Sequence, residues 1–301
     1  MPELPEVETI RRQLEPVCVG RRIESLRVLD PRWTAPVNPR AVEAAVAGRL
    51  VEALERRGKY LIFRLDGHRS LVMHLRMTGN LTVTALPEEP LADERLAPAA
   101  GREPYLRAEL LLEGGVRLAF TDARRFGHAV VLDGYALEGY LNARVGIEPL
   151  SEELTAAAIC RLAAGRRAPL KSFLLDQSAI AGIGNIYADE ALFRAGLHPL
   201  SPAGSLRPEH CERLREAIVA TLEAGLSAGG ASIDDYRDAR GERGAAQDEF
   251  LVHAREGEPC PRCSEAIRRI VVSGRSTYFC PRCQRRLRAR PRRGARAPAR
   301  G

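Results

Sequence analysis

Long apolar runs are missing from this chain of 301 residues. No stretch approaches the roughly 20 apolar residues that a membrane-spanning helix needs. The opening MPELPEVET is acidic and polar, whereas a secretory signal would be basic and then apolar. We therefore expect a cytoplasmic protein with no membrane partner. Hydrophobic residues still make up 45% of the chain, which is enough for two domains that each bury a core.

Lysine is nearly absent, because 44 of the 46 basic residues are arginine and only Lys59 and Lys171 are lysine. Such a bias is typical of a genome with a skewed base composition. A lysine amine is compact and titratable, and a guanidinium cannot replace it in that role. The two positions are therefore candidates for chemistry, with survival by chance as the equal alternative before motifs are considered.

The net charge of +7 does not come from the body of the chain. Residues 285–301 hold eight arginines and no acidic residue, which leaves 38 basic and 39 acidic residues elsewhere, a balance of −1. A tail of this composition is expected to be disordered. Its charge is compatible with binding to nucleic acid, binding to an anionic membrane, or no specific binding. A nucleic-acid-binding face on the body must come from local groups of arginine.

The seven cysteines are odd in number, which does not indicate a disulfide framework. Cys18, Cys160 and Cys211 fall in helical-looking segments, where we expect small buried apolar residues. The other four form two Cys-Pro-Arg-Cys pairs with sixteen residues between them. This spacing closes a tetrahedral site for one structural Zn²⁺, with the predicted ligands Cys260, Cys263, Cys280 and Cys283. The segment between the pairs predicts two strands and a turn at Ser273-Gly274, with Arg275 near its tip.

Hydrophobic periodicity divides the rest of the chain. A helix is predicted after Pro5 and ends near Gly20, and short strands over residues 22–132 favour a β-sandwich or flattened barrel with a short helix at 39–48. Residues 151–226 are Ala- and Leu-rich and predict helices. Residues 87–104 form a Pro-rich loop. Residues 229–250 are polar and Gly-rich, so we expect a mobile loop that does not pack.

The start MPELPE is a candidate for chemistry. Removal of the initiator methionine before Pro2 would expose a secondary amine. About a tenth of such terminal amines are unprotonated at neutral pH, against well under roughly a thousandth for lysine. This amine can attack an electrophilic carbon and form an iminium, with Glu3 and Glu6 placed to move protons. The alternative is that PELPE only starts a helix.

Seven motifs then occur in one order: MPELPEVETIRRQLEP, RRGKYLIFRL, HLRMTG, TDARRFG, LLDQSAIAGIGNIYADEALFRAGLHP, GGASIDDY and the CPRC pairs. With them the chain strongly resembles the formamidopyrimidine-DNA glycosylases over nearly its whole length, except residues 87–104 and the tail. Endonuclease VIII relatives share the architecture, but they typically begin PEGPE. The resemblance implies a nucleoid-associated enzyme of base excision repair, and the sequence gives no basis for expecting anything but a monomer. Such an enzyme removes oxidised purines from damaged duplex DNA and cleaves the strand by β,δ-elimination.

The resemblance and the periodicity together predict an α+β fold. An N-terminal β-sandwich with a flanking N-terminal helix precedes a C-terminal helical domain with a helix-two-turn-helix and a β-ribbon zinc finger. The expected parts are a catalytic domain (1–135), a helix-two-turn-helix domain (150–230), a lesion-covering loop (229–250), a zinc ribbon (251–284) and a basic disordered tail (285–301).

The resemblance also implies catalytic roles. Pro2 resembles the Schiff-base nucleophile, Glu3 the acid that protonates the sugar, and Lys59 the proton donor for β-elimination. Arg275 resembles the ribbon arginine that holds the phosphates beside the lesion and assists the δ-elimination. Glu6 resembles a supporting carboxylate, with a helix-start role as the alternative.

Further positions resemble DNA contacts. An extruded base leaves a gap that wedge residues fill, and Met77, Arg124 and Phe126 resemble such a trio. Taken singly, Met77 and Phe126 are better explained as core residues. Arg125 resembles a phosphate ligand. The chain departs from the family at Tyr105, where relatives usually carry a DNA-contacting histidine.

The Gly-rich AGIGNIY allows close backbone approach at Gly182 and Gly184. Asn185 either caps the following helix or presents its amide to a phosphate. The resemblance implies that this loop is part of a helix-two-turn-helix that grips DNA phosphates, to which Arg167 and Lys171 also belong.

A second departure lies in the covering loop, where aromatic residues often follow the glycine. Here Ala245 and Ala246 follow Gly244, a difference that could alter the preference for 8-oxoguanine while leaving the chemistry intact. Two alternatives remain: an endonuclease VIII-like enzyme for oxidised pyrimidines, and a non-catalytic zinc-ribbon protein that binds DNA. Simple binding needs no titratable terminal amine, which argues against the second.

Overall fold

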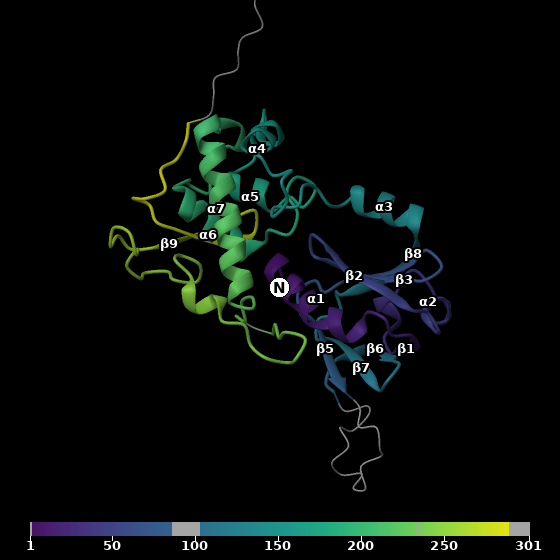
Figure 1. The fold of residues 1–301 in the computed structure, drawn as a ribbon. Helices are drawn as coiled ribbons and strands as arrows, with labels where there is room; N and C mark the ends of the chain where they lie inside the picture. The colour runs from purple at the N-terminus through teal and green to yellow at the C-terminus, as the bar shows by residue number, and fades with distance from the viewer. Residues whose placement is uncertain (1, 86–102, 234, 289–301) are drawn as a thin grey trace, which may run out of the picture.

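A computed structural model describes residues 2–85, 103–233 and 235–288 (Figure 1). Most of the predicted Pro-rich loop and most of the arginine tail lie outside these residues. The helices are α1 (Leu4–Cys18), α2 (Pro39–Val46), α3 (Gly134–Asn142), α4 (Ala156–Ala163), α5 (Leu170–Leu174), α6 (Asn185–Ala195) and α7 (Pro208–Ser227). The strands are β1 (Ile23–Val28), β2 (Val51–Arg57), β3 (Tyr60–Leu65), β4 (Arg69–His74), β5 (Gly79–Ala85), β6 (Leu106–Leu112), β7 (Val116–Asp122), β8 (His128–Asp133), β9 (Arg268–Val272) and β10 (Arg275–Phe279).

Two antiparallel four-stranded sheets build the N-terminal half, in the orders β1-β6-β7-β5 and β2-β3-β4-β8. Their inner faces share a core with α1, which contributes Val7, Ile10 and Leu14 at helical spacing. The predicted β-sandwich with a flanking helix is confirmed. The short helix predicted at residues 39–48 is α2.

Helices α4 to α7 form the second half around a core of their own, as predicted. Leu4, the first residue of α1, belongs to this second core, whereas Val7 belongs to the first. The start of the chain therefore lies where the two halves meet, as Figure 1 shows. Among the described residues, no helix is long and apolar enough to span a membrane.

The expectation that residues 229–250 do not pack is wrong. Tyr236 and Ala239 are buried in the sandwich core, and Ala231 and Ala246 are buried in the helical core. The Val83 N–H of β5 donates to the Ala239 carbonyl at 2.7 Å. The polar composition of the segment gave no sign of these few buried apolar residues. The segment packs against both halves of the molecule.

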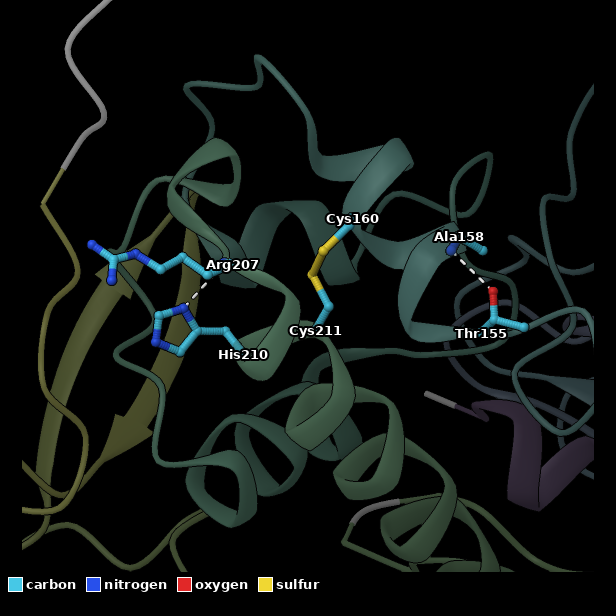
Figure 2. The surroundings of a disulfide bond; sticks show 6 residues. All are labelled: Thr155, Ala158, Cys160, Arg207, His210 and Cys211. Atoms are coloured by element: carbon cyan, nitrogen blue, oxygen red, sulfur yellow. Dashed lines mark hydrogen bonds between the residues drawn. A yellow bond between two sulfur atoms is a disulfide. The ribbon is translucent and has the colours of Figure 1, made fainter.

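The cysteine prediction needs a second correction. Cys160 on α4 and Cys211 on α7 form a disulfide instead of standing as separate apolar residues (Figure 2). The two helices pack with these Cα atoms 5.9 Å apart, a separation that a disulfide spans. An odd cysteine count does not exclude one pair. Cys18 is buried as predicted, and burial raises the pKa of its thiol to about 12.

Candidate active site at the start of the chain

The Glu3 carboxylate is buried against the N-terminus of α6. It accepts the backbone N–H groups of Gly184 at 2.7 Å, Ile186 at 3.0 Å and Tyr187 at 3.4 Å. A helix N-terminus offers unpaired donors and a positive dipole end, both of which stabilise an anion. Pro2 is buried directly ahead of Glu3. The fold therefore fixes a carboxylate beside the residue that would carry the terminal amine.

Glycine makes this contact possible. A Cβ added at Gly184 would lie 2.2 Å from Glu3 Cδ, and one at Gly182 would lie 2.7 Å from Leu4 Cβ. The Gly182 carbonyl accepts the Leu4 N–H at 3.0 Å. The predicted close approach at this Gly-rich loop is confirmed, and the approaching group is the start of the chain itself.

Glu6 lies one helical turn after Glu3 and is also buried. It accepts the Glu3 N–H at 2.7 Å, the Tyr187 hydroxyl at 2.7 Å and the Ala231 N–H at 2.7 Å. Burial, and then the nearby Glu3 charge, raise its pKa. The first contact belongs to a helix-start capping box. The helix-start role is confirmed, and Glu6 also joins α1 to α6 and to the segment after α7.

Lys59 enters the same region from the other half of the molecule. Arg57 pairs with Tyr60, so Gly58 and Lys59 form a two-residue turn between β2 and β3. The Lys59 ammonium donates to the Ile183 carbonyl at 3.1 Å, next to the Gly184 amide that binds Glu3. Burial lowers the pKa of Lys59, the Glu3 and Glu6 charges oppose that shift, and the Arg275 charge adds to it. A lowered pKa suits a proton donor and acceptor near neutral pH.

Arg275 begins β10 directly after the turn at Ser273 and Gly274. Both turn residues have positive φ, 49° and 76°, as a tight two-residue hairpin requires. The predicted turn is confirmed. The Arg275 side chain is exposed, and its charge acts on Lys59.

The four predicted metal ligands come together at the base of this hairpin, with their sulfur atoms within 4.8 Å of one another. Tetrahedral zinc holds thiolate sulfurs about 3.8 Å apart, so these residues fit one Zn²⁺: Cys260, Cys263, Cys280 and Cys283. All four positions are protein ligands, which gives the metal a structural role. Zinc binding would supply the folding energy of this small ribbon.

The predicted wedge residues lie on the surface. Phe126 is 52% exposed and the Arg124 guanidinium stacks on its ring at 4.9 Å. Met77 is half-buried, so neither Met77 nor Phe126 is a core residue. Arg125 is partly exposed and forms a two-point ion pair with Asp30, one contact being 2.8 Å.

The other expected DNA contacts differ in how accessible their side chains are. Tyr105 is 58% exposed and Arg167 is exposed. The prediction that Lys171 contacts a DNA phosphate needs correction. Its side chain is fully buried, and its ammonium pairs with Asp189 at 2.5 Å. The sequence does not reveal this pair, since the carboxylate comes from α6. Asn185 donates its amide to the Ser276 carbonyl at 3.1 Å and does not cap α6.

Several residues that the sequence did not single out hold the site. Gln177 accepts the Gly182 N–H at 3.0 Å and donates to Ile183 at 2.8 Å, which fixes the Gly-rich loop. Glu148 accepts the Gly58 N–H beside Lys59 and pairs with Arg56 at 2.8 Å. Gln177 could have been identified from the sequence because it lies in one of the family motifs. Glu148 lies outside these motifs, so nothing in the sequence pointed to it.

Comparison with known families gives matches to three domains. Residues 1–129 match the formamidopyrimidine-DNA glycosylase N-terminal domain, residues 145–237 match the formamidopyrimidine-DNA glycosylase H2TH domain, and residues 257–286 match the zinc finger found in FPG and IleRS.

Whole-chain relatives agree. A formamidopyrimidine-DNA glycosylase of Chloroflexus aurantiacus is 45% identical over 94% of this chain and 98% of its own. The solved MutM (Fpg) protein from Thermus thermophilus is 42% identical, with a TM-score of 0.80 over 94% and 98% of the two chains. The Lactococcus lactis Fpg in complex with DNA containing an abasic site is 33% identical, with a TM-score of 0.84 over 94% and 100%.

Proposed function

Because the chain belongs to the formamidopyrimidine-DNA glycosylase family, it is a DNA repair glycosylase, and we propose that it removes oxidised purines from duplex DNA and then cleaves the strand. The proposed lesions are 8-oxoguanine and formamidopyrimidines. A solved Lactococcus lactis Fpg variant is in complex with DNA that contains a formamidopyrimidine lesion, which supports this substrate class. We place the enzyme on chromosomal DNA in the cytoplasm, as a monomer.

The arrangement around Glu3 carries the proposal. The Pro2 amine, once methionine is removed, attacks the deoxyribose C1′ while the damaged base departs. The Glu3 carboxylate takes the proton that the attacking nitrogen releases and passes it to the ring oxygen, so the sugar opens to an iminium on Pro2. The iminium acidifies the neighbouring C–H, and loss of that proton expels the 3′ phosphate. A carboxylate of the site takes the C2′ proton, and Lys59 donates a proton to the departing 3′ phosphate.

The exposed residues bind the DNA in this proposal. Phe126, Arg124 and Met77 fill the space that the extruded base leaves. Arg275 holds the phosphates beside the lesion and assists loss of the second phosphate, and the bound zinc keeps its hairpin folded. Arg125 exchanges its ion pair with Asp30 for a phosphate, and Arg167 and Tyr105 contribute further contacts to the DNA.

Excision and covalent trapping on three duplexes test the proposal. One duplex contains 8-oxoguanine, one an oxidised pyrimidine and one an abasic site, and borohydride reduces any iminium. We expect the fastest release from 8-oxoguanine and a trapped adduct with the abasic duplex. Faster release of the pyrimidine would support an endonuclease VIII-like enzyme. Binding with neither release nor adduct would leave a zinc-ribbon DNA-binding protein.

A further inference from the structure

The hairpin that carries Arg275 is fastened to the helical domain by polar contacts that the proposed chemistry does not use. The Ser276 carbonyl, one residue after Arg275, accepts the Asn185 amide at 3.1 Å and the Lys171 ammonium at 3.5 Å. The Ser172 and Ser273 hydroxyls meet at 2.8 Å on the other side of the turn. Residues of α5 and α6 therefore hold both ends of the turn.

Asp189 organises this attachment from inside α6. Its side chain is fully buried, and its two oxygens bind Lys171 at 2.5 Å and the His253 ring at 2.9 Å. A buried carboxylate and a buried ammonium are each costly to desolvate unless they are paired, so removing either one strands the other. The neighbouring Glu190 accepts the N–H groups of residues 251–253, which fixes the chain leading into the ribbon.

We propose that Asp189 is a positioning residue, which acts through Lys171 and the Ser276 carbonyl to hold Arg275 over the active site. The inference rests on the proposed function, in which Arg275 binds DNA phosphate. It assigns Lys171 a different task from a direct phosphate contact, since its ammonium is fully buried and already hydrogen-bonded. Burial lowers the pKa of Lys59 and of Lys171, and the Arg275 charge adds to both shifts, so Arg275 lies within electrostatic reach of both amines.

A double-mutant cycle separates positioning of Arg275 from a direct phosphate contact by Lys171. Changing Lys171→Met and Asp189→Asn together removes both buried charges, and the new amide can still form a hydrogen bond with the His253 ring. This pair of changes is made in the wild type and in Arg275→Ala. Affinity for a duplex with a tetrahydrofuran abasic analogue is measured across salt concentrations, together with thermal unfolding and zinc content.

In the wild type we expect the pair of changes to weaken binding roughly tenfold. The slope of log K against log salt should become smaller by about 0.9, the value for one lost phosphate contact. In Arg275→Ala the same changes should cost less than about twofold and leave the slope as it is. A full loss in both backgrounds would mean that Lys171 or Asp189 acts without Arg275 and would overturn the proposal. Unchanged binding in the wild type would also overturn it.

Ser172→Ala tests the attachment without touching the core. It should weaken binding about twofold in the wild type and leave Arg275→Ala unaffected, and Ser25→Ala, an exposed serine on β1, should change nothing. If the variant with both Lys171→Met and Asp189→Asn loses zinc, Ser172→Ala becomes the deciding variant. Unchanged affinity of Ser172→Ala for DNA then overturns the proposal. Absence of a borohydride adduct in the wild type would instead remove the proposed function.

Discussion

The buried cluster at the start of the chain and the exposed face around Phe126 serve the same proposed reaction but differ in how the protein holds them. Glu3 and Glu6 are each 1% exposed and Lys59 is 6% exposed, and all three bind backbone groups. Phe126 and Tyr105 are 52% and 58% exposed. Buried charges cost free energy unless they are paired, and ionisable groups with perturbed pKa values cluster at functional sites. Exposed aromatic side chains leave apolar surface free for a ligand.

This contrast predicts its largest effect at Glu3. Glu3→Gln keeps the shape of the side chain but cannot transfer a proton, so base release should slow by on the order of 10²- to 10⁴-fold. Affinity for an abasic-analogue duplex should stay within about twofold. Single-turnover excision and a binding titration measure the two quantities. A variant that excises at the wild-type rate would remove Glu3 from the chemistry.

A smaller loss is expected when Glu3 is displaced rather than replaced. Gly184→Ala puts a methyl group where the Glu3 carboxylate lies, and a shift of about 1 Å at a reacting group costs on the order of 10²-fold in rate. Gly139→Ala on α3 is the matched control, because no atom outside its own stretch of helix lies within 4 Å of the added carbon. Equal excision rates for these two variants would contradict the account.

On the exposed face the loss should appear in DNA binding and not in folding. Phe126→Ala should weaken binding to a lesion duplex by about tenfold, a typical value for one lost aromatic contact with a base. Its thermal unfolding should match the wild type, since the ring is half-exposed. Tyr135→Ala is the control, because Tyr135 is 94% exposed on α3. A lowered unfolding temperature in Phe126→Ala would erase the distinction between the two regions.

The smallest expected effect is on how the free energy of unfolding depends on pH. Burial raises the pKa of Glu6, so the folded protein holds this proton at pH values where the unfolded chain has lost it. The stabilisation by this proton is complete below the unfolded pKa and is lost as pH rises through the folded pKa. Glu6→Gln cannot titrate, so its free energy of unfolding should fall less over this range. Chemical denaturation at several pH values measures the difference, and parallel curves would count against a raised pKa.

Local patterns in the sequence predicted much of this architecture. The two Cys-Pro-Arg-Cys pairs, the turn at Ser273-Gly274 and the helical spacing before Gly20 are each complete within a few residues, so composition and spacing indicate them directly. The structure bears these predictions out.

Contacts between distant segments could not be predicted in this way. The Cys160–Cys211 disulfide, the Lys171–Asp189 pair and the burial of Tyr236 depend on how separate elements pack. Residues 229–250 look polar because their four apolar anchors are scattered among charged residues. The burial of Glu3 is similar, since the donors that bind it lie more than 180 residues further along the chain.

The central claim is that Pro2 is the nucleophile, and mapping the trapped adduct tests it most directly. Active protein is reduced with borohydride on an abasic duplex and digested, and the modified peptide is sequenced by mass spectrometry. We expect the sugar on the nitrogen of Pro2 at the start of the peptide, with methionine removed. An adduct on Lys59, or active protein whose methionine is retained or whose amino end is acetylated, would contradict the account.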